Sequence, residues 1–294
     1  MTRRRPRQSS PSPYWANPSI PGQFDLAVLK PATLASGQRF ETLKDVRARR
    51  KRLRAALTTS SIKAVRYFLE EIGACDDVEP CGQPYCPSCA RQFRRWTCAQ
   101  LLKLAEKHPR ANKSIVTVNL GHFSGGTLRS ADPAKAASAL RKRLSRSWMD
   151  GATVAGGIEV AWHQADRKWR LHAHLLVIGV EPEAIESIRR GEGDLEIDEF
   201  RDPAKQLSYL LKFLTGHRPI EQTGPKKSPL FPLPRQRLIE LISWASKFGP
   251  SEFLFLYGVR RSGRNLVLTR RQNARSAARP TAPARLRRRK RKVL

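Results

Sequence analysis

Residues 155–178 read AGGIEVAWHQADRKWRLHAHLLVI, and this stretch decides the fold. Two apolar runs of strand length, residues 155–162 and 169–178, flank a short polar connection. This pattern predicts an antiparallel β-hairpin. His172 and His174 are two residues apart, so on a strand both imidazoles point to the same face of the sheet.

The register of this hairpin decides whether Glu159, on the first run, joins the histidines. If the connection closes around residues 166–167, Glu159 lies directly across from His174. Ala161 then faces His172, and the site is an open one of two imidazoles and one carboxylate for a divalent cation. A connection one residue longer or shorter would turn Glu159 to the opposite face. The alternative interpretation is two solvated or hydrogen-bonded histidines on a polar sheet face.

Strand and helix patterns alternate on both sides of the hairpin. Before it, residues 114–121 (SIVTVNLG) are a β-branched run, and residues 133–149 predict a helix with Asp132 as its N-cap. After it, residues 252–259 and 264–269 predict a final strand pair. The fold class that these patterns indicate is α+β.

Three helices are expected closer to the N-terminus, over residues 41–57, 61–71 and 90–108. The first is dense in positive charge, and the third combines an apolar stripe with basic side chains. We expect the basic side chains of the third helix to bind nucleic-acid phosphates, namely Arg91, Arg94 and Arg95.

Four cysteines, Cys75, Cys81, Cys86 and Cys89, lie between the second and third of these helices with the spacing C-x5-C-x4-C-x2-C. The last two lie in CGQPYCPSC, whose glycine and prolines favour tight turns that bring thiolates together. We predict a structural Zn²⁺ site, and the alternative is that these are ordinary small core residues. Cys98 falls inside the following helix and is interpreted as a spare buried thiol.

The charge balance points to a polyanionic partner. The 294 residues include 56 Lys and Arg against 25 Asp and Glu, a formal net charge of +31. The positive side chains of such a chain repel one another in a compact fold unless a bound polyanion such as nucleic acid balances them. The apolar stretches are too short for a membrane span and no secretory signal is visible, so we expect the protein to be cytoplasmic. In the cytoplasm its cysteines would stay reduced.

Composition divides the chain into four regions. Residues 1–40 are predicted to be a disordered arm rich in Arg and Pro, and residues 41–110 a helical region with the cysteine cluster. Residues 111–270 form the predicted α+β core. Residues 271–294 are predicted to be a disordered basic tail.

Residues 202–216, DPAKQLSYLLKFLTG, predict one further helix with a proline start and a glycine stop. At 100° per residue, Tyr209 lies roughly 160° around the helix axis from the centre of the apolar stripe. It is therefore on the same side of the helix as Lys205 and Lys212. That position suits a phenol that must approach a phosphate. The alternative is a surface tyrosine lying over its neighbours. The stripe consists of Leu207, Leu210, Leu211 and Leu214.

Together these motifs resemble the HUH endonucleases, most closely the rolling-circle replication initiators of small plasmids. The resemblance spans about residues 75–214, and its specific part is the H-A-H strand together with Y-L-L-K. It implies a ferredoxin-like antiparallel sheet with the metal site on its face. It also implies single-stranded DNA or origin hairpin DNA as substrate, with a host helicase as a possible partner.

The resemblance assigns roles to individual residues. Tyr209 would be the nucleophile, forming a 5′-phosphotyrosine and a free 3′-OH, with Lys212 balancing charge at the phosphate. Mg²⁺ or Mn²⁺ would be held by His172, His174 and Glu159. The chain departs from the pattern at Lys205, where some plasmid initiators carry a glutamate used in the terminating cleavage. Other HUH enzymes use a second tyrosine, but this sequence has neither a Y-x-x-x-Y motif nor two adjacent tyrosines.

Three other functions remain open on the sequence. A single-tyrosine transposase would share the chemistry and differ in the DNA element it serves. A non-catalytic zinc-containing DNA-binding protein explains the charge and the cysteines but leaves Glu159, His172, His174 and Tyr209 unexplained. A cupin-like metal oxygenase fits the ligands but not the arginine-rich helices.

Overall fold

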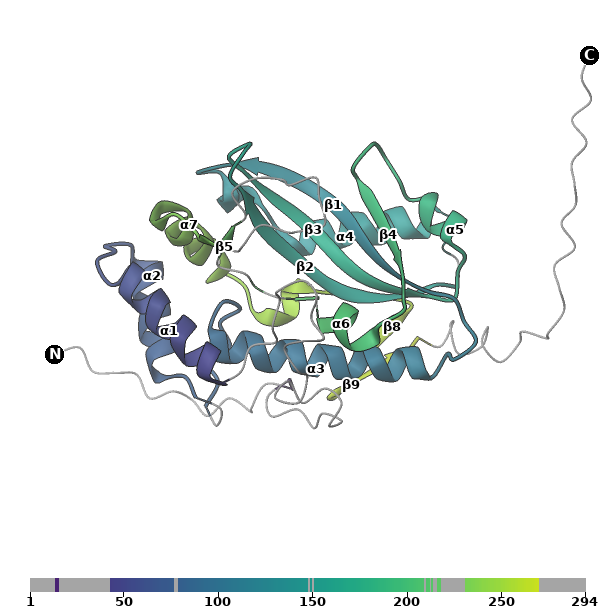
Figure 1. Cartoon of the computed structure of the whole chain (residues 1–294), viewed down its shortest axis with the longest axis horizontal. Coiled ribbons are helices and arrows are strands. Elements are labelled where there is room, and N and C mark those ends of the chain that lie inside the picture. The colour runs from purple at the N-terminus through teal and green to yellow at the C-terminus, as the bar shows by residue number, and fades with distance from the viewer. Residues whose placement is uncertain are drawn as a thin grey trace, which may run out of the picture.

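The chain folds into an α+β structure in which one antiparallel sheet is surrounded by helices (Figure 1). The computed structural model describes residues 14–15, 43–76, 79–147, 149, 151–208, 210–211, 213, 216–217 and 231–269, without the side chains of residues 204, 205, 216 and 217. The predicted α+β class is confirmed. The predicted basic arm and tail lie almost entirely outside the described residues, apart from residues 14–15.

Five strands form the main sheet in the order β4-β1-β3-β2-β7, and every neighbouring pair is antiparallel. The strand with both histidines, β3, is therefore central and hydrogen-bonded on both edges. The bounds of the five strands are β1 Lys113–Ser124, β2 Thr153–His163, β3 Lys168–Ile178, β4 Leu195–Glu199 and β7 Leu254–Tyr257.

The helices differ in how they relate to the sheet. The longest, α3, runs along one side of it and packs against α1 and α6, while α4 lies behind the sheet and α5 lies beside β4 (Figure 1). Within the described residues the helices are α1 Leu43–Leu57, α2 Lys63–Ala74, α3 Pro87–Glu106, α4 Pro133–Ser145, α5 Pro182–Glu186, α6 Pro203–Ser208 and α7 Arg235–Ala245, with 3-10 turns η3 Leu128–Ser130 and η4 Pro250–Phe253.

The predicted N-cap of α4 is confirmed, because the Asp132 carboxylate accepts hydrogen bonds from the backbone N–H groups of Ala134 and Lys135 at 2.9 and 3.0 Å. These bonds satisfy donors that a helix N-terminus otherwise leaves open. The helix ends at Ser145, four residues before its predicted end.

Two strand predictions are corrected. The predicted strand 114–121 continues to Ser124, because a β-bulge between Asn119 and Gly121 lets pairing with β3 resume. The predicted strand 252–259 is divided at Gly258: β7 joins the main sheet, whereas β8 (Val259–Ser262) pairs with β9 (Asn265–Leu268). Gly258 has φ +70°, a conformation that glycine adopts without strain and that breaks the strand.

The hydrophobic core is continuous from the N-terminal helices into the sheet. α3 is buried around most of its circumference, and aromatic contacts of Phe213 with Phe93 and Phe253 join it to the segment after α6 and to η4. A short pair, β5 (Gly216–His217) and β6 (Phe231–Pro232), follows this segment. No helix within the described ranges is long and apolar enough to cross a membrane.

Candidate metal centres

Glu159, His172 and His174 meet on one face of the sheet. Their ligand atoms all lie within 4.8 Å of one another, and the imidazole rings of the two histidines are 4.6 Å apart between centroids. The central hairpin creates this arrangement, because β2 and β3 are paired over their whole length and cross-strand partners share a face. The three residues form a group that can hold a metal ion.

The predicted hairpin register is wrong by two residues. Glu159 lies across from His172, and Gly157 lies across from His174, so Ala161 faces Arg170 instead of a histidine. The last pair is His163 with Lys168, which leaves a four-residue connection where two residues were expected. A shift of two residues preserves the face of every side chain, so the ligand set survives the error.

Hydrogen bonds orient all three ligands. Thr117 Oγ1 lies 2.9 Å from His174 Nδ1, and the backbone oxygen of Arg170 lies 3.3 Å from His172 Nδ1. With both Nδ1 atoms engaged, the Nε2 atoms are the ones to offer a cation. His174 Nε2 is 3.8 Å from Glu159 Oε2, so the imidazole and the carboxylate already face one another across the site.

Burial makes this group a half-enclosed site. Glu159 and His174 are each 6% exposed, whereas His172 is only half-buried. A buried carboxylate is costly without compensation, and Glu159 receives one hydrogen bond from the backbone N–H of Phe213 to Oε1 at 3.2 Å. The remaining carboxylate oxygen faces the histidines. A ligand entering from solvent therefore meets the His172 side first.

The predicted helix over residues 202–216 is largely wrong, because α6 ends at Ser208. Leu211 and Phe213 have φ of +56° and +46°, which no α-helix contains. The helical-wheel argument for an outward Tyr209 therefore loses its basis. Tyr209, Lys212 and Leu214 lie outside the described residues, as does the side chain of Lys205.

Tertiary contacts explain why the helix stops. Leu211 packs directly on the backbone of β2 at Gly157, where an added Cβ would come within 2.3 Å of Leu211 Cδ2. Phe213 is held from both ends: its N–H donates to Glu159 and its carbonyl accepts from the buried Arg49 of α1. These contacts offset the strain of two left-handed residues, so the segment flanking Tyr209 lies against β2, the strand that carries Glu159.

The four predicted cysteines also converge. Cys75 Sγ lies 3.5 Å from both Cys86 Sγ and Cys89 Sγ, and Cys81 Sγ lies 3.7 Å from Cys89 Sγ. Four sulfurs bound at about 2.3 Å to a tetrahedral Zn²⁺ would be about 3.8 Å apart, so this spacing fits a metal. The cluster is a group that can hold an ion, in agreement with the cysteine spacing.

Local structure prepares the cluster for a cation. Gly82, at φ +75°, turns the chain so that its N–H points at Cys89 Sγ at 3.3 Å, and the Cys81 N–H lies 3.4 Å from Cys75 Sγ. Hydrogen bonds from the neighbouring thiols lower the pKa of Cys86, while the same crowding raises the pKa of Cys89. Four thiols so close together cannot all ionise unless a cation balances them.

Cys98 is separate from this cluster, as predicted. It is buried in α3, its Sγ donates to the carbonyl of Leu207 at 3.1 Å, and burial raises its pKa to about 11. The thiol therefore stays protonated and links α3 to α6.

Tyr85, between the cysteines, connects the two candidate metal centres. It is 1% exposed and packs edge-on against Phe213 with ring centroids 5.5 Å apart. Burial raises the pKa of Tyr85, the nearby Glu159 charge raises it further, and Arg49 opposes both. Its phenol is therefore buried and neutral, which suits packing and not attack on a phosphate.

His122 is a residue near the site that the sequence did not single out. It lies beyond the bulge in β1 and pairs with Arg170, which places it on the same face as His172. His122 is exposed, and its Nε2 lies 2.5 Å from Asn119 Nδ2, while Asn119 is itself directly across from His172. Residues 122–124 (HFS) contain no β-branched residue and Gly121 looked like a strand end, so local pattern did not reveal this part of the strand.

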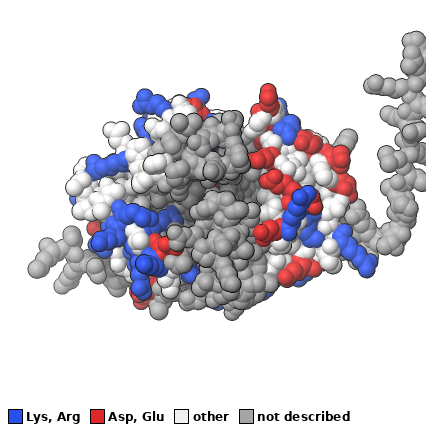
Figure 2. All heavy atoms as spheres, viewed as in Figure 1, with Lys and Arg blue, Asp and Glu red and all other residues white. Residues whose placement is uncertain are grey.

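Charge is unevenly distributed over the surface. Blue side chains gather where α1 lies, whereas red ones are frequent on the side of β4 and α5 (Figure 2). The exposed cations of α1 are Lys44, Arg47, Lys51, Arg52 and Arg54. The predicted phosphate-binding residues Arg91, Arg94 and Arg95 are half-buried in the first half of α3.

A comparison of the chain with known protein families, with curated proteins and with solved structures finds no match. The function is therefore inferred from the sequence and from the geometry of the two metal centres.

Proposed function

We propose that this protein is a metal-dependent endonuclease that nicks single-stranded DNA with Tyr209 as nucleophile, in the manner of an HUH replication initiator. The observation that carries the proposal is the convergence of Glu159, His172 and His174 on the central hairpin, with both histidine Nδ1 atoms engaged. Two imidazoles and one carboxylate with an open side suit a cation that must also bind substrate.

The surroundings of Tyr209 give separate support. Tyr209 is outside the described residues, but Leu211 contacts Gly157 and Phe213 binds Glu159, so its near neighbours lie on the metal-bearing strand. The left-handed residues at Leu211 and Phe213 are a local departure from good helix geometry, and such departures concentrate at functional sites. Lys212 is proposed to balance the charge of the phosphate.

The proposed reaction is a transesterification. The Tyr209 phenol loses its proton, and its oxygen forms a bond to the scissile phosphorus. The P–O3′ bond breaks, and the 3′ oxygen leaves and takes up a proton, giving a 5′-phosphotyrosine and a free 3′-OH. Mg²⁺ or Mn²⁺ held by Glu159, His172 and His174 would supply Lewis acidity toward a phosphoryl oxygen. Because one phosphoester replaces another, the strand can later be rejoined.

Within this proposal the remaining features bind and position DNA. The exposed cations of α1 provide sequence-independent affinity for the phosphate backbone. Zn²⁺ at the four cysteines would fix the start of α3 relative to α2, and Tyr85 and Arg49 then brace Phe213 beside Glu159. Arg91, Arg94, Arg95 and Lys205 are proposed as further phosphate contacts.

Covalent adduct mapping tests the proposal. The full chain is incubated with labelled single-stranded oligonucleotides and Mn²⁺, and the adduct is digested and located by mass spectrometry. We expect the modified peptide to contain Tyr209, and Tyr209→Phe to abolish the adduct while DNA binding persists. Tyr67 is exposed on α2, so Tyr67→Phe is the matched control and should leave the adduct unchanged.

Variants of the metal ligands separate the parts of the mechanism. His172→Ala and His174→Ala should lose nicking, and excess Mn²⁺ should restore part of it, because a weakened site still binds at high metal concentration. Excess Mn²⁺ should restore nothing in Tyr209→Phe. If wild-type protein binds DNA but never forms an adduct, the non-catalytic zinc-containing DNA-binding protein is the correct function instead.

A further inference from the structure

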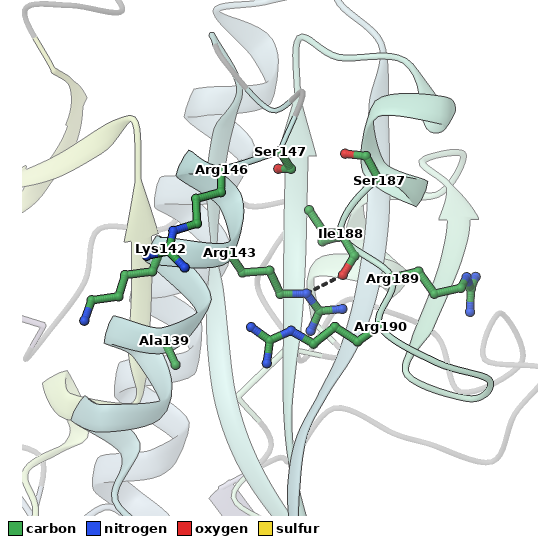
Figure 3. Close-up of a pocket in the computed structure, with 9 residues that line it drawn as sticks. All are labelled: Ala139, Lys142, Arg143, Arg146, Ser147, Ser187, Ile188, Arg189 and Arg190. Atoms are coloured by element: carbon green, nitrogen blue, oxygen red, sulfur yellow. Dashed lines mark hydrogen bonds between the residues drawn. The ribbon is translucent and has the colours of Figure 1, made fainter.

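A cavity of about 350 Å³ lies between the second half of α4 and the turn that follows α5, and we call it the basic pocket (Figure 3). Five of its nine lining residues are basic, and none of these nine is Asp or Glu. The side chains come from two separate elements that meet across the cavity (Figure 3). The basic residues are Lys142, Arg143, Arg146, Arg189 and Arg190.

Arg143 forms the fixed floor of this pocket. Its side chain is 8% exposed, its Nε donates to the carbonyl of Ile188, and its guanidinium pairs with Asp194 Oδ2. The same carboxylate oxygen also restrains the turn, since it accepts from the backbone N–H of Arg190 at 3.0 Å. The Arg143 guanidinium and the backbone of Arg190 are thus positioned before any ligand arrives.

The pocket has an excess of positive charge. Asp194 offsets Arg143, and Glu186 offsets Arg189 through a contact of 2.7 Å from Nε. Lys142, Arg146 and Arg190 are exposed and add three further charges around a space lined by small residues. Like charges held this close repel one another, and an anion with several acceptor oxygens relieves that repulsion.

A purely structural reason accounts for only part of this cluster. Basic residues in the last turn of a helix are favoured by the helix dipole, which explains Lys142 and Arg143. It does not explain why Arg190, from the turn after α5, extends toward Arg143, while the neighbouring Arg189 points away and pairs with Glu186 (Figure 3). Convergence of cations from two elements is what a site for a phosphate group requires.

A second cavity of about 300 Å³ shares Arg143 and Arg190 with the basic pocket and extends to Asn119 and His122 of β1. Asn119 is directly across from His172. The second cavity therefore marks a path around the edge of β1, from the face that carries His172 to the basic pocket, which lies with α4 on the opposite face of the sheet. A polymer of phosphates can follow such a path, whereas a single phosphate ion has no need of it.

We propose that the basic pocket binds a backbone phosphate of the DNA strand that extends from the Glu159, His172 and His174 site. The ligand is a phosphodiester of a single strand. This inference rests on the proposed function, because it takes the strand cleaved at the metal site to be the strand that the pocket holds. The contact would fix the strand on one side of the cleavage point.

Charge reversal with a matched control tests the proposal. In the full-length Tyr209→Phe protein, Lys142→Glu with Arg146→Glu is compared with Arg129→Glu with Lys135→Glu. Both pairs remove the same charge from exposed positions, but Arg129 and Lys135 lie near the start of α4 and do not line the pocket. Fluorescence anisotropy then measures binding of labelled single-stranded oligonucleotides of increasing length at several salt concentrations.

We expect the pocket variant to bind long oligonucleotides about tenfold more weakly than the control variant, with a salt slope smaller by about 1.4 because two phosphates are no longer neutralised. Short oligonucleotides should show no difference. Lys142→Gln with Arg146→Gln should give a smaller loss in the same direction, and circular dichroism confirms that each variant is folded.

Two results would overturn the proposal. One is equal binding by pocket and control variants at every length. The other is a loss that is the same for all lengths and that millimolar inorganic phosphate abolishes, which would assign the pocket to a small phosphate ligand. Binding is measured without cleavage, so a failure of the nicking reaction would be seen in the adduct experiment and not in this one.

Discussion

At Gly157 the sheet and the segment flanking Tyr209 lie close together. An added Cβ would lie 2.3 Å from Leu211 Cδ2 and Cγ, a distance that real contacts do not show. We therefore predict that Gly157→Ala lowers the free energy of unfolding by about 1–3 kcal/mol, the usual cost of overpacking. Urea denaturation followed by circular dichroism measures the change.

Two further variants make this prediction specific. Gly191→Ala is the control, because nothing lies within 4 Å of its added Cβ, and it should be nearly neutral. Leu211→Ala removes the clashing side chain, so the double variant should cost less than the sum of the single changes. Additive effects would show that Leu211 is not the group that Gly157 accommodates.

Thr117 affects the metal site through a single hydroxyl. Its Oγ1 lies 2.9 Å from His174 Nδ1, and such partners fix the orientation and basicity of a ligating imidazole. We expect Thr117→Val to weaken Mn²⁺ binding about 10–100-fold without unfolding the protein. Calorimetric titration measures this, and Thr127→Val, which removes a hydroxyl that donates to the carbonyl of Ser124, should bind Mn²⁺ like the wild type.

Among single residues, the sequence identified the residues that could hold a metal but not their neighbours. Alternation on a strand was enough to put His172 and His174 on one face, because that periodicity depends only on local backbone geometry. The roles of Thr117, Arg49 and His122 depend on pairing with distant strands and helices. No pattern within a single segment contains that information.

At the scale of elements, the central hairpin was predictable and α6 was not. The hairpin is decided by two apolar runs and a polar turn, so an error in turn length changed the register but not the face. The helix pattern of residues 202–216 is strong, yet helix formation stops at Ser208. Contacts of Leu211 and Phe213 with β2 override local propensity, which is a weak determinant once tertiary packing competes.

The cysteine cluster joins the end of α2 to the start of α3, so its metal should be structural. We predict that the purified protein holds one Zn²⁺ and that Cys81→Ser releases it and lowers the melting temperature. Elemental analysis and thermal denaturation measure both effects. Cys98→Ala is the matched control: this cysteine is buried but apart from the cluster, so the Zn²⁺ content should stay unchanged. Full retention of zinc in Cys81→Ser would disprove the site.

Glu240 of α7 fixes the turn after β1. Burial alone would raise its pKa, but hydrogen bonds from the backbone N–H groups of Leu128 and Gly126, together with Arg237, lower it. Because its pKa is lowered, the Glu240 carboxylate stabilises the fold at any pH above its ordinary pKa of 4.5. This contribution is lost as the pH falls through the lower pKa of the folded state.

The pH dependence of stability tests this role. Glu240→Gln should be less stable than wild type by about 1 kcal/mol at pH 7, and the difference should disappear at a pH well below 4.5. Denaturation at a series of pH values measures it. A difference that stays constant down to acid pH would mean that Glu240 contributes through packing and not through its charge.

For the whole molecule, the main organising feature is that two candidate metal centres share one core. Tyr85 from the cysteine cluster and Arg49 from α1 both contact Phe213, which in turn binds Glu159. The N-terminal helices and the sheet are therefore connected at the metal site. Sequence composition separated residues 41–110 from residues 111–270, but these contacts and the continuous core join the two regions.

The excess charge of the chain should determine how strongly it binds DNA. The formal charge of +31 includes an Arg- and Lys-rich stretch at residues 271–294 that contains no Asp or Glu. Replacing every Arg and Lys in this stretch by Gln keeps its length but removes its charge. Each phosphate that the substituted stretch no longer neutralises lowers the salt slope of single-strand binding by about 0.7, so we expect a clearly flatter dependence of affinity on salt.

Anisotropy titrations of the full chain and the Gln-substituted chain at several salt concentrations measure the two slopes. The metal site should be unaffected, so Mn²⁺ binding provides the control for folding. If the tail binds phosphates independently of the basic pocket, substitutions at Lys142 and Arg146 should lower the slope by the same amount in either background, because distant and independent interactions add. Equal slopes with and without the charges of residues 271–294 would show that this stretch does not bind DNA phosphates.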